Sequence, residues 1–114
     1  MTITFNWKDS MIEINNEVCK TLDYPQYVQL VLNAEKKLFG IKPCEIDCES
    51  VLVMPDSDVQ LVEIPAKALV RNIWKLMKWD TENPRVCVGM YLNAHQIVVF
   101  DLNEAYEVIP GAVS

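Results

Sequence analysis

The sequence predicts an α+β domain, mainly β, made of two tandem β-β-α-β-β repeats. Two recurrences point to this duplication. The triplet Leu32-Asn33-Ala34 returns sixty residues later as Leu92-Asn93-Ala94, and Glu13-Ile14 returns fifty residues later as Glu63-Ile64. Around these landmarks, apolar and polar residues alternate in short runs typical of half-buried strands. Because the landmarks keep the same order in both halves, we expect an internal repeat within a single domain over residues 1–114.

The first repeat is predicted over residues 1–43. Its elements follow as strand, strand, helix, strand and strand, over 2–7, 11–14, 16–22, 27–32 and 38–42. Asn15 or Asn16 is the expected N-cap of the short helix. The last two strands flank a tight turn that opens with Asn33, a residue type that tolerates left-handed backbone.

The second repeat is predicted over residues 50–108. Its elements follow in the same order, over 50–54, 59–64, 65–79, 85–92 and 96–101. Pro65 suits the first position of the helix, where its missing N–H would be unpaired anyway. At 100° per residue the helix is amphipathic. Its apolar face is formed by Leu69, Val70, Ile73, Trp74, Leu76 and Met77.

The two hairpins are expected to match residue by residue at a spacing of sixty, with Val28, Leu30 and Leu32 equivalent to Val88, Met90 and Leu92. Glu13 and Glu63 alternate with apolar neighbours and are therefore expected to face outward. An acidic connection over 44–49 joins the repeats. The wider segment 45–58 carries five acidic residues and no basic ones.

This order of elements resembles the swapped-hairpin fold of the AbrB and SpoVT regulators and related antitoxins. In the first repeat, Ile12-x-Ile14 followed by Leu22 looks like the family's end of second strand and end of helix. In the second, Val62-x-Ile64-Pro65 looks like its "V-x-I-P" entry into the helix. The resemblance implies a pseudo-twofold barrel that two repeats in one chain close internally. Such fusion would cover the strand edges that a single repeat of about 45 residues leaves open.

The chain departs from the family's DNA-binding members in the loop between the first two strands, where those proteins carry Arg and Lys. The matching stretches here are Lys8-Asp9-Ser10 and the acidic Pro55-Asp56-Ser57-Asp58. Asn15 stands in the proline position of the first repeat, the glycine that commonly precedes the second strand is absent from both, and the second helix is longer than is usual. The chain also looks like small proteins of bacterial mobile elements. The resemblance therefore favours the fold more than DNA binding.

Composition narrows the classes of function. A hydrophobic fraction of 51% argues against disorder. The first residues lack the basic and apolar pattern of a signal peptide and no apolar run is long enough to span a bilayer, so a cytoplasmic protein with no membrane partner is expected. A net charge of −6 disfavours nucleic acid, although it does not exclude it as a partner.

No catalytic, cofactor or metal site is predicted. The four cysteines Cys19, Cys44, Cys48 and Cys87 are interpreted as free thiols in a reducing compartment. The C-x3-C spacing of Cys44 and Cys48 is not that of most zinc or redox motifs, and a metal or redox role is the alternative. His95, the single histidine, is expected at an exposed hairpin turn.

One basic stripe stands out on the second helix, where Lys67, Arg71, Lys75 and Lys78 fall on the face opposite the apolar one. It is interpreted first as a solvated face whose last lysines complement the helix dipole. The functional alternative is contact with an anion or an acidic partner. The tryptophans Trp7, Trp74 and Trp79 are interpreted as core or rim aromatics rather than as platforms for base stacking.

These features favour a non-enzymatic AbrB-like regulatory or protein-interaction module, with a protein partner or self-association through an exposed strand edge or the second helix. One alternative is a DNA-binding transcription regulator that uses the basic face of that helix. A second alternative is a small-ligand-binding barrel. The partner, the oligomeric state and the role of the acidic connection are left open.

Overall fold

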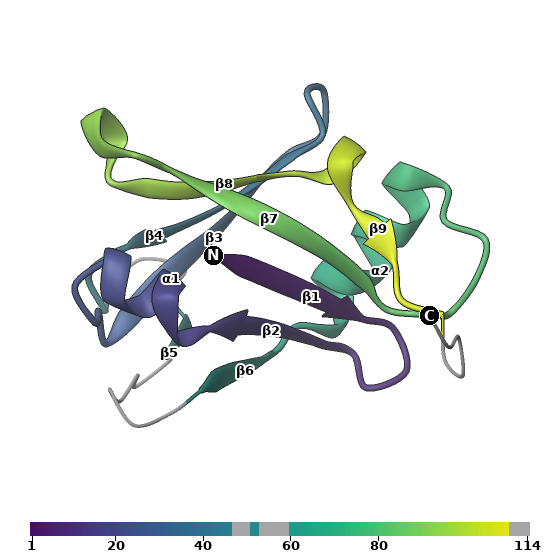
Figure 1. The fold of residues 1–114 in the computed structure, drawn as a ribbon, viewed down its shortest axis with the longest axis horizontal. Helices are drawn as coiled ribbons and strands as arrows, with labels where there is room; N and C mark the ends of the chain where they lie inside the picture. Colours follow the sequence, from purple (N-terminus) through teal and green to yellow (C-terminus); the bar gives the residue numbers. More distant parts are fainter. Residues whose placement is uncertain (47–50, 53–59, 110–114) are drawn as a thin grey trace.

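A computed structural model describes residues 1–46, 51–52 and 60–109. Within this part the chain forms one antiparallel sheet that curls into a half-barrel, together with two α-helices at its opposite ends (Figure 1). The mainly β, α+β class predicted from the sequence is confirmed. In the described residues the sheet has nine strands, in the order β5-β3-β4-β8-β7-β1-β2-β6, with β9 paired to β7.

The elements of the first half agree closely with their predicted ranges. They are β1 (Thr2–Asn6), β2 (Met11–Asn15), α1 (Asn16–Thr21), β3 (Tyr27–Asn33) and β4 (Leu38–Pro43). Asn15 is the N-cap of α1 by position, but its side chain accepts a hydrogen bond from the Thr2 N–H at 3.1 Å instead of capping the helix. It therefore ties the start of β1 to the end of β2.

The second half follows the same order. Its elements are β5 (Val51–Leu52), β6 (Leu61–Pro65), α2 (Lys67–Met77), β7 (Arg85–Leu92), β8 (Ile97–Asp101) and β9 (Tyr106–Glu107). Two 3₁₀ turns, η1 (Asn93–His95) and η2 (Leu102–Glu104), precede and follow β8. Residues 47–49 of the acidic connection, and the predicted strand over 50–54 apart from β5, lie outside the described residues.

The prediction that the second helix begins at Pro65 is wrong. Pro65 is the last residue of β6, opposite Met11, and Ala66 is the N-cap. The Ala66 N–H donates to the Ser10 carbonyl at 3.0 Å, so the chain is still held to β2 one residue later. Proline is tolerated there because β6 is the end strand of the described sheet, where a missing N–H breaks no ladder. The helix ends at Met77, and its C-cap Lys78 has a left-handed φ of 55°.

The predicted sixty-residue match between the hairpins is also wrong, by one residue. Leu30 and Leu32 pack against the core, whereas Val88 and Met90 point to the other side of the sheet and are 64% and 66% exposed. The hairpin ladders close at Asn33↔Leu38 and at Leu92↔Ile97, which lie 59 residues apart. A shift of one residue turns every side chain of a strand to the opposite face.

The core fills the concave side of the sheet. Phe5 of β1, Phe39 of β4 and Phe100 of β8 meet at its centre, with no exposed surface. Both helices add apolar side chains to it. The buried apolar residues are Ile3, Phe5, Ile12, Ile14, Val18, Cys19, Leu22, Val28, Phe39, Ile41, Val62, Ile64, Val70, Ile73, Trp74, Cys87, Val98, Phe100 and Leu102.

Glu13 and Glu63 face outward as predicted, but the ladder between β2 and β6 also places them directly opposite each other. Burial raises the pKa of Glu13, and the carboxylates of Glu63 and Asp9 raise it further. Like charges at opposed positions of an antiparallel pair are destabilising. Since the folded chain holds the Glu13 proton more tightly than the unfolded chain, this group makes stability fall as pH rises above the usual pKa of a glutamate.

Glu63→Lys is therefore expected to raise the free energy of unfolding at neutral pH by about 0.2–1 kcal/mol, because it turns the repulsive pair into an attractive one. Urea unfolding at pH 7 and pH 4 measures the effect, which should be smaller at the lower pH as Glu13 takes up a proton. Glu35→Lys is the matched control, since it makes the same change of charge in an exposed turn. An equal gain in both variants would mean that net charge, and not the opposed pair, is responsible.

Candidate functional site

The predicted basic stripe on α2 is divided by the structure. Lys67, Lys75 and Lys78 are exposed. Arg71 is half-buried: the carbon of its guanidinium lies 3.7 Å from the centroid of the Trp7 ring, and Nη1 donates to the Trp7 carbonyl at 3.1 Å. Arg71 thus joins the middle of α2 to the chain just after β1, and three cations of the stripe are left facing solvent.

All three tryptophans gather beside this stripe, although they are far apart in the sequence. Trp74 is buried in α2, and the half-buried Trp7 and Trp79 flank it. The ring centroids of Trp7 and Trp74 are 5.5 Å apart, and those of Trp74 and Trp79 are 4.7 Å apart in an edge-to-face arrangement. The interpretation of the tryptophans as core or rim aromatics is confirmed. Their assembly into one cluster was not predicted.

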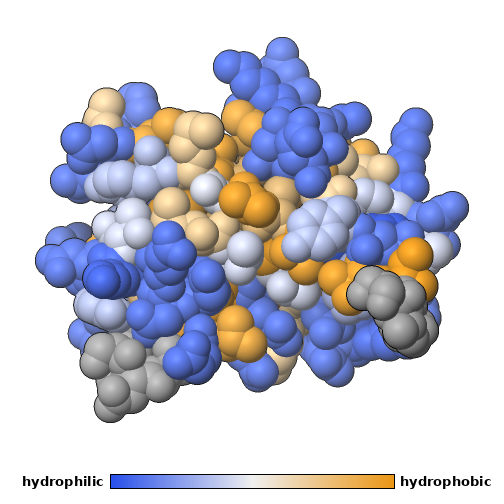
Figure 2. Space-filling view, viewed as in Figure 1, coloured by the Kyte–Doolittle hydropathy of each residue, from blue (hydrophilic) through white to orange (hydrophobic). Residues whose placement is uncertain are grey.

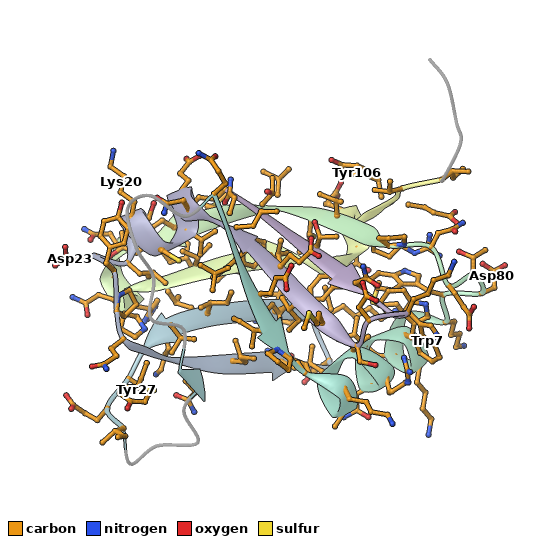
Figure 3. All side chains as sticks on the ribbon, turned by 90° about the horizontal axis from the view of Figure 1, so that it is seen from below. Trp7, Lys20, Asp23, Tyr27, Asp80 and Tyr106 are labelled. Carbon is orange, nitrogen blue, oxygen red and sulfur yellow. The ribbon has the colours of Figure 1, made fainter. Side chains whose placement is uncertain are left out.

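This cluster lines an open pocket of about 350 Å³, which we call the tryptophan pocket. It is lined by Trp7, Arg71, Trp74, Lys75, Lys78, Trp79 and Asp80. It includes three of the four cations predicted as an anion or partner contact, and leaves out Lys67. Figure 3 shows Trp7 and Asp80 at the same end of the molecule, opposite the end that carries Lys20 and Asp23. The pocket therefore belongs to the α2 end alone.

A polar network anchors the segment that follows α2. Arg85 is only 5% exposed, and its Nη1 lies 3.1 Å from Oε1 of Glu107 in β9. Glu107 also accepts hydrogen bonds of 2.6 Å from Thr81 and from Asn83. These bonds, from Thr81 first and then Asn83, hold the pKa of Glu107 below its usual value, with Arg85 adding to the effect.

The network reaches the tryptophans directly. The Thr81 carbonyl accepts a hydrogen bond from the Trp74 indole at 2.8 Å, and the Arg85 guanidinium carbon lies 5.2 Å from the Trp79 ring centroid. The Trp7 indole donates to Glu82 at 3.0 Å. Two of the three indole N–H groups are thus fixed by the 81–82 segment, which sets the orientation of the pocket walls. Nothing in the local sequence around Arg85 or Glu107 indicates that these residues pair.

The cysteines and the histidine are not brought together in the described part of the chain. Cys19 and Cys87 are buried. Burial, with the nearby carboxylates of Asp101 and Glu104, raises the pKa of Cys87 to about 11, and its thiol donates to the Asp101 carbonyl at 2.8 Å. His95 is exposed in η1, as predicted. A thiol held protonated in this way is a poor nucleophile at neutral pH.

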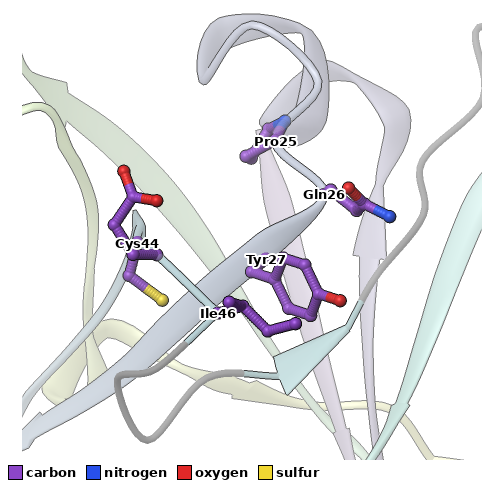
Figure 4. A pocket seen from close by; sticks show the side chains of 6 residues that line it. Pro25, Gln26, Tyr27, Cys44 and Ile46 are labelled. Carbon is purple, nitrogen blue, oxygen red and sulfur yellow. The ribbon is translucent and has the colours of Figure 1, made fainter.

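The predicted pair Cys44 and Cys48 falls partly outside the described residues, since Cys48 is not among them. Cys44 follows β4 and lines a surface hollow of about 500 Å³ with Pro25, Gln26, Tyr27, Glu45 and Ile46 (Figure 4). Its lining includes Ile46, the last residue described before 47–50, so we assign no candidate site to it. Within the described residues, no group of three or more His, Cys, Asp or Glu is placed to hold a metal ion.

The convex side of the sheet carries an apolar patch, which we call the outer sheet face. The ladders align Val31, Gly40, Val99 and Met90 in one uncharged row across β3, β4, β8 and β7. Val88 and Leu92 extend the row along β7 with exposures of 64% and 37%. Figure 2 shows apolar side chains gathered across the middle of the face that β7 crosses, with hydrophilic groups around them. The sequence matched Val88 and Met90 to Val28 and Leu30 of the first hairpin, and it did not predict this outer face.

No helix in the described part of the chain is both long and apolar enough to cross a membrane. Comparison of the chain with protein-family models, with curated proteins and with solved structures finds no match in any of the three.

Proposed function

We propose that the chain is a non-enzymatic regulatory or protein-interaction module built as a pseudo-twofold swapped-hairpin barrel. The strand pairings support the two-repeat arrangement. If the four strands β1 to β4 of the first repeat are exchanged in order with β5 to β8 of the second, the pair of β1 with β7 becomes the pair of β5 with β3. The hairpin of β3 and β4 becomes the hairpin of β7 and β8. The β2–β6 and β4–β8 pairs turn into themselves. The β1–β2 hairpin would require a β5–β6 counterpart, most of whose intervening chain lies outside the described residues.

Two backbone hydrogen bonds support the same exchange. The Asn16 N–H donates to the Gln60 carbonyl, and the Ala66 N–H donates to the Ser10 carbonyl, each at 3.0 Å. The two donors, Asn16 and Ala66, are fifty positions apart in the sequence, and so are the two acceptors, Ser10 and Gln60. After the helices, equivalent positions of the two repeats are 59 residues apart, as are the left-handed turn residues Lys37 and Gln96. The greater length of α2 and of the segment after it accounts for the difference.

In this arrangement each repeat covers strand edges that the other repeat would leave exposed. β2 pairs with β6 and β4 pairs with β8, so strands that would be edges of one repeat are covered by the other. These strand pairs form within one chain, so they do not require a second copy. A module whose two repeats cover each other leaves other surfaces for a partner, and the outer sheet face is an exposed apolar one.

The outer sheet face carries the functional part of the proposal, and we assign a second copy of this chain as its occupant. Gly40 and Val99 are paired across β4 and β8 and are 59 residues apart, so they are equivalent positions of the two repeats. The pseudo-twofold axis that relates the repeats therefore passes between them, through the middle of the face. A patch centred on a twofold axis can meet its own copy in an isologous contact. The row Val31, Gly40, Val99 and Met90 holds no charge, so it adds no local repulsion at the place where two chains of net charge −6 would meet.

Met90→Lys is expected to abolish this self-association, because it places a cation in the middle of an apolar contact that another copy would have to bury. Light scattering after gel filtration measures the molar mass at chain concentrations up to about 100 µM, where a small interface would associate. Leu61→Lys, on β6 and 51% exposed, is the matched control and should leave the mass unchanged. A wild-type chain that stays monomeric throughout, or a Met90→Lys chain that still dimerises, would contradict the proposed occupant.

The DNA-binding alternative is less well supported by the arrangement of α2. Arg71, the central cation of the predicted stripe, stacks on Trp7 and bonds its carbonyl, so only Lys67, Lys75 and Lys78 face solvent. Three exposed lysines on a chain with sixteen acidic residues offer few phosphate contacts to a duplex.

A further inference from the structure

The tryptophan pocket combines two kinds of recognition group. The indole of Trp79 is partly open to solvent, whereas the half-buried Trp7 ring carries the Arg71 guanidinium 3.7 Å from its centroid, and Trp74 is only 5% exposed. Lys75 and Lys78 line the same pocket and are exposed. Aromatic faces bind flat π-systems, and ammonium groups bind phosphate or carboxylate. The combination suits a ligand that is planar at one end and negatively charged at the other.

The local charge agrees with such a ligand. The C-terminal end of α2 contributes a partial negative charge of about −0.5, which disfavours an anion. Two full positive charges, on Lys75 and Lys78, more than offset it. Asp80 also lines the pocket, and Glu82 bonds the Trp7 indole, so an anionic group is directed away from these carboxylates and toward the two lysines. Asp80 remains available to accept hydrogen bonds from hydroxyl or amino groups.

The size of the pocket limits the ligand. A volume of about 350 Å³ lies at the small end of the range for small-molecule sites, which is roughly 300–1,000 Å³. That suits a ligand of mononucleotide size. The same chemistry is presented by a free nucleotide and by a terminal nucleotide of a single strand, because stacking on aromatic side chains does not depend on base identity.

We infer that the tryptophan pocket binds the base and phosphate of a single nucleotide, with the base against the partly exposed indole of Trp79 and the phosphate at Lys75 and Lys78. The pre-set geometry supports this assignment. Arg71 holds Trp7 to α2, and the network around Arg85 and Glu107 holds the 81–82 segment that fixes the Trp7 and Trp74 indoles. The walls are thereby positioned without a ligand, which lowers the entropic cost of binding. This assignment is independent of the proposed self-association.

Intrinsic fluorescence tests the inference directly, because all three tryptophans of the chain line this pocket. Adenosine monophosphate is expected to change the emission saturably, and to bind about tenfold more tightly than adenosine, which lacks the phosphate. Lys75→Glu and Lys78→Glu should each weaken binding of the nucleotide by about tenfold or more, with adenosine little affected. Both side chains are exposed, so thermal melting should show that the variants fold as the wild type does.

Lys67→Glu is the matched control. It makes the same change of charge on the same helix, outside the pocket, and should keep nearly the full affinity. A short single-stranded oligothymidylate forms the second arm: tighter binding than the mononucleotide would identify the end of a strand as the source, and equal or weaker binding would identify a free nucleotide. Absence of saturable change with both probes, equal affinity for adenosine and its monophosphate, or an equal loss in Lys67→Glu and Lys75→Glu would overturn the inference.

Discussion

Phe39→Ala is expected to lower the free energy of unfolding by about 3–5 kcal/mol, the largest effect of any substitution proposed for this chain. Phe39 has no exposed surface. Its ring centroid lies 5.5 Å from that of Phe5 in an edge-to-face contact and 6.3 Å from that of Phe100. In the sheet, β4 and β1 are separated by β8 and β7, so the contact between Phe5 and Phe39 spans the concave side. Truncation would leave a cavity where the two sides of the half-barrel meet.

Urea unfolding followed by circular dichroism measures this loss, and Phe39→Leu should show a smaller one because most of the volume is kept. Val31→Ala on the neighbouring strand is the control, since Val31 lies on the convex side and is 37% exposed. Its cost should be below about 1 kcal/mol. A Phe39→Ala variant as stable as Val31→Ala would mean that the aromatic contact does not hold the curled sheet together.

Gly89→Ala is expected to cost about 1–3 kcal/mol through overpacking. A Cβ atom at this position would lie 2.6 Å from Cε1 of Phe100 and 2.9 Å from Cγ1 of Val98. Both neighbours are fully buried in β8, so neither can move without disturbing the core. Glycine is needed at this position because the Phe100 ring lies against the β7 backbone, and not because of its conformational freedom.

Gly40→Ala is the informative comparison, because its Cβ would also come very close to a neighbour, at 2.5 Å from Cδ1 of Ile97. That atom is the end of a flexible, half-exposed side chain on the outer sheet face, which can rotate away. The gain from restricting the unfolded chain, about 0.4–1 kcal/mol, then offsets the remaining strain. Thermal melts of the two variants should therefore differ clearly. Equal losses would show that the outer face is packed as rigidly as the core.

Strands with one buried and one polar face could be predicted from the alternation of apolar and polar residues. The strand β7 shows why this alternation does not identify the buried face of every strand. In β2, Ile12 and Ile14 are buried on either side of Glu13, so alternation identifies both the strand and its inward face. In β7, Val88, Met90 and Leu92 alternate in the same way, yet they face outward while Cys87, Gly89 and Tyr91 face the core. A strand that is apolar on both sides has no period that tells its faces apart.

The tryptophan pocket could not be predicted for a different reason. Trp7 and Arg71 are 64 positions apart, and the pairing of Arg85 with Glu107 depends on β9 returning to β7. Neither is encoded in a local motif. The family resemblance directed attention to the loops between the first two strands, whereas the cations at this site come from the last turns of α2 and the residue just after it. Only the basic stripe of α2 could be recognised from the sequence, and its central residue, Arg71, packs against Trp7.

The helices differ in length, with six residues in α1 and eleven in α2, and this difference makes the two ends of the half-barrel unlike each other. A perfectly repeated chain would present two equivalent poles, and any molecule that recognised one would recognise the other. Here every indole of the protein lies at the α2 pole. A compound that stacks on indole should therefore saturate at one equivalent per polypeptide, even with the two-repeat arrangement that we propose for the strands.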